Sequence, residues 1–161
     1  MTLGLQIWIN DIPILLVVIY APNGNQKEFF KHLYRKLVEL QKRNICIVGD
    51  FNSIANFQNH SNAGKNKKGK RELPKICREK MKELNLTDIW RRLHPEKRQF
   101  TFYSNPHQTW TWIDMAWMSG EIANETKEVE ILPNEWADHN PIQVIWKGRA
   151  KPKKRWTLNT Q

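Results

Sequence analysis

A run of four apolar residues without polar alternation, at positions 45–48, limits the folds open to this chain. Asn44 and Gly49 bound the run, as turn residues bound a strand. Apolar side chains on both faces of a strand must be covered from both sides. The run therefore predicts a strand buried on both faces, and the end of this strand is a place to expect chemistry.

The residues before this run predict a hairpin and a helix. Two runs rich in β-branched side chains, at 5–9 and 14–20, are separated by turn residues and predict a β-hairpin. Apolar residues recur at helical spacing over about 26–42, which predicts an amphipathic helix. Asn25 and Glu28, three residues apart, have the form of a capping box at its start.

The residues after this run predict a second helix and then mostly strands. Pro74 precedes apolar positions at helical spacing up to Leu84, and a short further turn is expected within 86–93. Apolar and aromatic runs at 100–103, 110–117, 129–132 and 141–146 read as strands. Strands thus dominate both ends of the chain, and two helices lie between them.

Size and charge bound the class of protein. The chain has 161 residues, which allows one domain or part of one, and a formal net charge of +10. An excess of positive charge favours a polyanionic partner such as nucleic acid, although scattered lysines also serve simply as a solvated surface. The basic side chains cluster in the tail 148–161, which reads as a linker, and in one loop: Lys65, Lys67, Lys68, Lys70 and Arg71.

Several classes of protein are disfavoured. The longest apolar stretch, 12–20, is far below the roughly 20 residues of a membrane-spanning helix, so no membrane association is expected. The N-terminus lacks the pattern of a signal peptide, which predicts an intracellular protein, nuclear and cytoplasmic. Cys46 and Cys77 lie in no metal-binding or disulfide pattern and are expected to be buried thiols.

Asp50 and Asn52 directly follow the predicted buried strand. In an extended segment their side chains would point the same way, and a carboxylate beside an amide could hold a water molecule near a phosphate. The same residues could instead form an Asx turn that closes the strand. The pattern of these residues leaves both interpretations open.

Four further residues could carry chemistry. Asp114 is a single acid in an apolar, aromatic strand and therefore needs a partner, for which a histidine is suitable. Asp138 and His139 are adjacent in a loop and could supply a metal ligand and a phosphate-binding imidazole, although a lone loop histidine is more often only solvated. Tyr20 ends a strand with a phenol that could reach a phosphate or simply pack.

Four of these segments occur in the order of a known family. IYAPN (19–23), GDFN (49–52), ID (113–114) and ADHNP (137–141) resemble the second half of the endonuclease/exonuclease/phosphatase family. LHPEKRQFTFYSNPH (93–107) and RWTLN (155–159) resemble the endonuclease domain of vertebrate LINE-1 retrotransposon second open reading frame proteins. The resemblance implies a two-sheet α/β sandwich over residues 1–147, a partial domain without the family's N-terminal portion, followed by the basic tail.

The resemblance also implies roles for these residues. Asp50 would activate the attacking water with help from Asn52, and His139 would contact the scissile phosphate, oriented by Asp114. Asp138 would belong to the divalent-metal site, for Mg²⁺ or Mn²⁺, and Tyr20 would touch the phosphate. The implied reaction is nicking of DNA to leave a 3′-hydroxyl that primes reverse transcription, by a reverse transcriptase region that could follow in a longer parent chain.

Two departures from the family shape the functional expectation. The family's first half supplies an Asn and a metal-binding Glu that these 161 residues do not contain, so the chain as written is expected to cleave DNA weakly or not at all. Thr111 and Trp112 stand where the family has a small or polar residue and then a basic one. The alternatives are a non-catalytic fragment that binds nucleic acid or protein, and a phosphatase for lipid head groups. The sequence leaves the oligomeric state open.

Overall fold

The strand expected at 45–48 lies inside a five-stranded sheet. The computed structural model describes residues 1–9, 11–54, 72–134 and 137–147. In it, β3 (Ile45–Asp50) lies between β2 (Ile12–Tyr20), to which it is parallel, and β7 (Asp114–Ser119), to which it is antiparallel. The sheet has the order β1-β2-β3-β7-β4, with β1 (Thr2–Ile9) and β4 (Leu86–Asp88) at its edges. Ile45, Cys46 and Ile47 are buried, which confirms the prediction.

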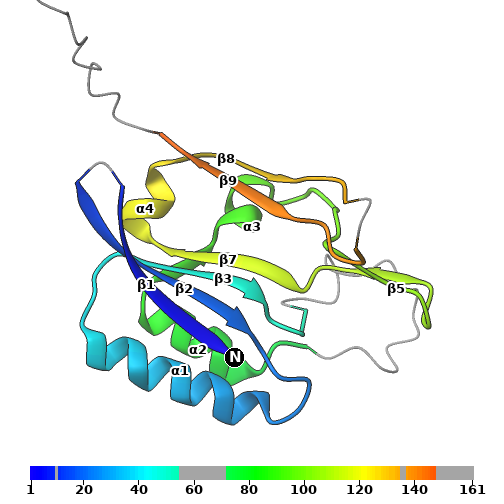
Figure 1. Cartoon of the computed structure of the whole chain (residues 1–161), viewed down its shortest axis with the longest axis horizontal. Coiled ribbons are helices and arrows are strands. Elements are labelled where there is room, and N and C mark those ends of the chain that lie inside the picture. Colours follow the sequence, from blue (N-terminus) through cyan, green and yellow to red (C-terminus); the bar gives the residue numbers. More distant parts are fainter. Residues whose placement is uncertain (10, 55–71, 135–136, 148–161) are drawn as a thin grey trace, which may run out of the picture.

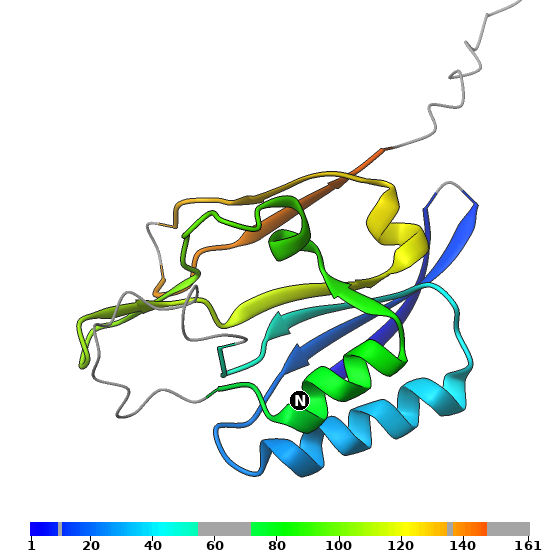
Figure 2. The same ribbon diagram turned by 180° about the vertical axis from the view of Figure 1, so that it is seen from behind.

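Different layers cover the two faces of this sheet. Helices α1 (Gln26–Leu40) and α2 (Lys75–Glu83) lie along one face (Figure 1). The other side carries α3 (Ile89–Leu93), α4 (Gly120–Asn124) and the two-stranded sheet of β8 (Thr126–Ile131) and β9 (Ile142–Trp146), as the reverse view in Figure 2 also shows. A third sheet, of two strands, joins β5 (Phe102–Ser104) to β6 (Thr109–Thr111). The expected α/β class and the second strand layer are confirmed.

The N-terminal elements follow the sequence pattern, with one error. β1 and β2 form the expected antiparallel hairpin. Helix α1 buries Phe30, Leu33 and Leu37, the apolar face predicted for it. The predicted capping box is wrong: Asn25 has a left-handed φ of 53°, and its side chain makes no capping hydrogen bond. A capping side chain requires an extended backbone at that position, which Asn25 does not have.

The C-terminal half differs from expectation in its short elements. Residues 86–93 form a strand, β4, before the short helix α3, and α4 was not predicted. The run 110–117 divides into β6 and β7, because the Thr101 hydroxyl oxygen accepts hydrogen bonds from the backbone N–H groups of Ile113 and Asp114 (3.2 and 3.1 Å). Both cysteines are free and buried, as predicted, and burial raises the pKa of the Cys46 thiol to about 12. In the described part of the chain, no helix is long and apolar enough to cross a membrane.

Asp88, the N-terminal cap of α3, provides a test of stability against pH. Its carboxylate accepts a hydrogen bond from the Arg91 N–H (3.3 Å), and burial raises its pKa to about 6. Because the pKa of Asp88 is higher in the folded protein than in the unfolded chain, its ionisation disfavours folding. The free energy of unfolding is therefore unaffected by this group below about pH 4 and falls as the pH rises through 6. Asp88→Asn keeps a capping oxygen, so we expect thermal unfolding at pH 7 to show a gain of up to about 3 kcal/mol. The gain should vanish at pH 4, and an equal gain at both pH values would contradict this account.

Candidate active site

Three neighbouring strands place Tyr20, Asp50 and Asp114 in one row. Tyr20 is the register partner of Asp50 on β3, and Asp50 is the partner of Asp114 on β7. Side chains at paired positions project from the same face of a sheet. Tyr20 is 53% exposed at the outer end of the row, whereas Asp50 and Asp114 are half-buried. The strand ends thus gather two carboxylates and a phenol on one face.

Gly49 allows β3 to approach β2 just before this row. Its φ is +134°, a conformation that L side chains rarely adopt, and a Cβ here would lie 2.0 Å from the Ile19 carbonyl oxygen. Any other residue would have to push the two strands apart or change the path of the chain. Glycine therefore fixes the position from which the Asp50 side chain emerges.

An Asx turn follows Asp50. The Asn52 backbone N–H donates to Asp50 Oδ1 (2.6 Å), and the Asn52 side-chain amide donates to the Ala21 carbonyl (2.7 Å). Asn52 has a φ of 48°, so the expectation of an extended segment with two parallel side chains is wrong. The turn anchors one carboxylate oxygen of Asp50 in the loop. A part for Asn52 in positioning water remains a prediction.

Gln26, which sequence reasoning missed, ties together the loops after β2 and β3. It is only 4% exposed, and its amide nitrogen lies 3.0 Å from the carbonyl oxygens of both Pro22 and Phe51. The Ser53 hydroxyl donates to Gln26 Oε1 (2.5 Å). The signal in the sequence was the spacing of Gln26 from Phe30. The two residues are four positions apart and lie on the same face of α1, so a polar side chain occupies a position on the buried face of the helix.

Removing this amide should destabilise the protein. Gln26→Ala would leave buried carbonyl and hydroxyl groups without partners, and we expect a loss of about 2–4 kcal/mol in the free energy of unfolding. Denaturant unfolding measures this, with the adjacent exposed residue as control: Lys27→Ala should change stability by less than about 0.5 kcal/mol. Equal losses in the two variants would show that the Gln26 bonds contribute little.

His139 contacts Asp114. The His139 Nδ1 atom lies 2.9 Å from Asp114 Oδ2, and the two side chains are 34% and 19% exposed. This hydrogen bond is the main cause that raises the pKa of His139, and the carboxylates of Asp50 and Asp138 add to the effect. Burial chiefly raises the pKa of Asp50, with a further contribution from the charge of Asp114. The surroundings of the cluster therefore raise the pKa of both His139 and Asp50.

Backbone bonds hold the histidine loop against the segment around β5. The Tyr103 N–H donates to the Asp138 carbonyl (3.0 Å), and the Asn140 N–H donates to the Thr101 carbonyl (2.6 Å). The ring of His139 packs on Phe102, with centroids 4.7 Å apart. Thr101 is fully buried and also binds the Asp114 N–H, so it positions both ends of the Asp114–His139 pair. No pattern in the sequence indicated this role.

A group of three side chains could hold a metal ion. Ligand atoms of Asp50, Asp114 and His139 all lie within 4.8 Å of one another. The His139 Nδ1 atom is bound to Asp114, and the carboxylate oxygens of Asp50 and Asp114 are ligands that suit Mg²⁺ or Mn²⁺. Asp138, the expected metal ligand, is exposed and outside this group, although its charge raises the pKa of both Asp50 and His139.

The expected nucleic-acid-binding residues cannot be placed relative to this cluster. The tail 148–161 lies outside the described residues, as does the whole basic loop: Lys65, Lys67, Lys68, Lys70 and Arg71. Their contribution to binding remains a prediction from charge.

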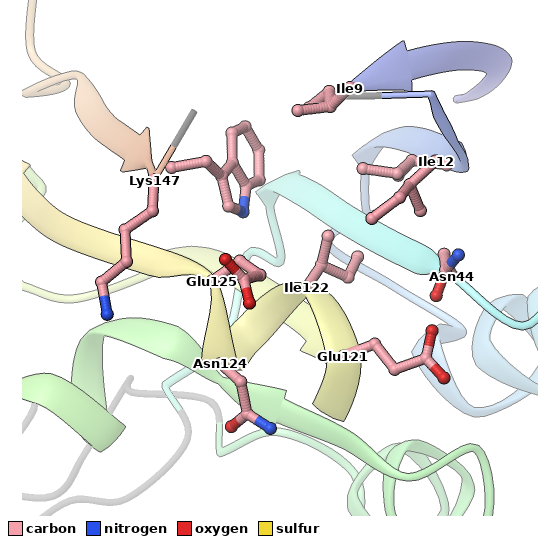
Figure 3. Close-up of a pocket in the computed structure, with 10 residues that line it drawn as sticks. Ile9, Ile12, Asn44, Glu121, Ile122, Asn124, Glu125 and Lys147 are labelled. Carbon is pink, nitrogen blue, oxygen red and sulfur yellow. The ribbon is translucent and has the colours of Figure 1, made fainter. Parts of the chain in front are cut away.

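A separate cavity lies at the other end of β3. It has a volume of about 290 Å³, and Asn44, which precedes β3, is one of its lining residues (Figure 3). Ile9, Ile12 and Ile122 form apolar walls, and Glu121 stands on α4. Positions 44 and 50 are about 20 Å apart along an extended strand, so this cavity is distinct from the carboxylate cluster.

Comparison with solved structures identifies the fold. No model of a protein family matches the sequence. An AP endonuclease from Archaeoglobus fulgidus aligns over 89% of this chain and 64% of its own, with a TM-score of 0.72 and 17% identity. The AP endonuclease LMAP from Leishmania major covers 89% of this chain and 53% of its own (TM-score 0.74, 20% identity). The 3′ phosphatase NExo from Neisseria, bound to a product DNA hairpin, covers 83% and 61% (TM-score 0.68, 18% identity).

The chain therefore has the endonuclease/exonuclease/phosphatase fold, as expected from the sequence. It spans between 53% and 64% of the length of these solved structures. The carboxylate and histidine cluster lies at one end of the five-stranded sheet of this fold.

Proposed function

We propose that this chain carries the catalytic residues of a divalent-metal-dependent DNA endonuclease of the LINE-1 type. The observation that supports this most directly is the cluster of Asp50, Asp114 and His139. Asp50 and Asp114 are 64 positions apart in the sequence, and Asp114 and His139 are 25 positions apart. The strand register and one loop nevertheless bring the three residues together. The motifs resembling LINE-1 proteins at 93–107 support the finer assignment.

The residues suit hydrolysis of a phosphodiester. Asp50, with its raised pKa, would accept the proton of the attacking water. His139 would donate from Nε2 to a phosphate oxygen, while its Nδ1–H donates to Asp114 and fixes the orientation of the ring. Mg²⁺ or Mn²⁺ held by the carboxylates of Asp50, Asp114 or Asp138 would neutralise charge on the phosphate. Tyr20, exposed at the end of the row, would contact the phosphate from the side of β2.

Nicking of supercoiled plasmid DNA tests the activity. We expect metal-dependent nicking by an extended form, in which an N-terminal portion that supplies the Asn and the metal-binding Glu implied by the resemblance is joined to the chain. The 161-residue chain should nick weakly or not at all, because the family's Asn and Glu are not among its residues. If the extended form bound DNA but never cut it, a non-catalytic binding module would replace the nuclease proposal.

DNA binding should depend steeply on salt. The net charge of +10 and the loop residues 65–71 predict binding through released counterions, with the logarithm of affinity falling by about 0.9 per phosphate contact for each unit of log salt. We expect a smaller slope when Lys65, Lys67 and Lys68 are changed to Gln. The control is Lys27→Gln, Lys31→Gln and Lys36→Gln on α1, with the same loss of charge. Equal slopes in the two triple variants would show that the loop makes no specific contribution.

A further inference from the structure

A groove lies at the β4 edge of the five-stranded sheet. It has a volume of about 570 Å³, and its lining residues come from the segment 82–92 and from β7. β1 forms the opposite edge of the sheet, so the groove is built by elements away from the N-terminal hairpin. Its polar side chains are mostly hydrogen-bond donors, and two of them are the exposed cations Lys82 and Arg92. A groove of this composition suits an anionic ligand.

The two exposed cations have no carboxylate partner among the described residues. Lys82 forms no ion pair there, and Arg92 donates to the neutral amide oxygen of Asn124. The acids nearest to Lys82 in the sequence are already used in ion pairs: Glu72 with Arg78, Glu79 with Lys75 and Glu83 with Lys80. Two positive charges therefore remain available to a ligand at this groove.

Trp117 brings a buried donor to the same groove. It lies on β7 as the register partner of Asp88, and its indole Nε1–H is buried without a hydrogen-bond partner in the described part of the chain. A buried polar group without a partner costs free energy, so such groups are rare in folded proteins and call for a ligand or an ion. Asn85, which is exposed, adds a neutral amide to the lining.

Asp88 is the single acid among the lining residues, and its charge is already compensated. Its carboxylate is 9% exposed and accepts a hydrogen bond from the Arg91 N–H at the start of α3. The positive charge of Arg91 also acts on this carboxylate. Lys82 and Arg92 are therefore not needed to balance Asp88.

The groove is separate from the carboxylate cluster. Trp117 is three residues beyond Asp114 on β7, which is about 10 Å along an extended strand. Successive side chains of a strand alternate between faces, so Trp117 and Asp114 project from opposite faces of the sheet. A ligand that contacts the Trp117 indole in this groove therefore does not occupy the cluster.

We propose that this groove binds a phosphate group of a nucleic-acid strand, as a contact separate from the carboxylate cluster. Lys82 and Arg92 neutralise the phosphate, and the Trp117 N–H donates to one of its oxygens. Phosphodiester oxygens only accept hydrogen bonds, which matches a lining of donors. A strand rather than a single anion is favoured because contacts to exposed cations are weak one at a time, and the net charge of +10 attracts a polyanion. The proposal concerns binding and does not depend on cleavage.

The indole N–H signal of Trp117 tests the site by NMR. The full 161-residue chain, labelled with ¹⁵N and free of metal ions, is titrated with a short thymidine oligonucleotide and separately with inorganic phosphate. Trp117→Phe identifies the signal among those of the eight tryptophans. We expect the signal to move with both, with a Kd for the oligonucleotide about tenfold lower, since neighbouring phosphates add contacts. A signal that stays in place would overturn the proposal, and equal Kd values would show a site for small anions instead.

A pair of double variants separates the groove from the general positive charge of the chain. Lys82→Gln with Arg92→Gln should weaken the oligonucleotide response of Trp117 by about tenfold, because two charge-assisted contacts are lost. Lys82→Gln alone should act in the same direction and leaves the Arg92–Asn124 bond intact. The matched control is Lys42→Gln with Arg43→Gln, two exposed cations between α1 and β3, which should change the Kd by less than about twofold. Equal weakening in the two double variants would overturn the assignment to this groove.

Discussion

Asp50→Asn is expected to lower the rate of metal-dependent nicking by about 10²–10⁴-fold, the usual contribution of a general base. Asparagine retains an oxygen that can accept the Asn52 N–H, so the turn after β3 should survive. The amide cannot take a proton from water. The measurement is the initial rate of plasmid nicking by the extended form, with DNA affinity measured in parallel.

The matched control for this prediction is Asp11→Asn. Asp11 is exposed in the hairpin turn and has a left-handed φ of 63°, which asparagine tolerates. We expect nicking at the parent rate in this variant. A substantial rate in Asp50→Asn, with DNA affinity unchanged, would remove Asp50 from the catalytic role.

Asp114→Asn is expected to reduce nicking by a similar factor, about 10²–10⁴-fold, because the partner that orients His139 is lost. The same change should lower the pKa of His139, since the hydrogen bond to Asp114 is the main cause of its elevation. It should also lower the pKa of Asp50, which the charge of Asp114 raises. Titration by NMR of the His139 ring and the Asp50 carboxyl group measures both shifts.

Glu128→Gln serves as the control for the loss of one negative charge, because Glu128 is exposed on β8. It should leave the titration of His139 and the nicking rate unchanged. If Asp114→Asn left the His139 pKa where it was, the Asp114–His139 contact could not be the source of the shift.

The elements that could be predicted from the sequence are those whose local pattern agrees with their burial. The run 45–48 predicted an internal strand because both of its faces are apolar, and α1 followed from the spacing of Phe30, Leu33 and Leu37. Elements of three to five residues, such as β4 and α4, were missed because so short a segment depends on tertiary packing. The break between β6 and β7 depends on Thr101, which comes from a separate segment.

Some residues of the candidate site could be predicted from the sequence, and others could not. Asp50, Asp114 and His139 could be proposed because acids and histidines stand out beside apolar strands. Gln26 and Thr101 could not, since their role is to bind backbone groups of distant segments, and hydrogen bonds of that kind leave no periodic pattern. Asn25 shows the opposite error, where a familiar spacing did not match the backbone conformation.

The row of Tyr20, Asp50 and Asp114 limits how a gene for this protein can vary in length. Deleting one codon within β3 ahead of Asp50 would turn its carboxylate to the face covered by α1 and α2, because successive side chains alternate. A codon lost from the loop between β8 and β9, by contrast, changes the reach of His139 without inverting any side chain. Length variation among natural versions that keep activity should therefore collect in loops, and β2, β3 and β7 should keep their residue counts.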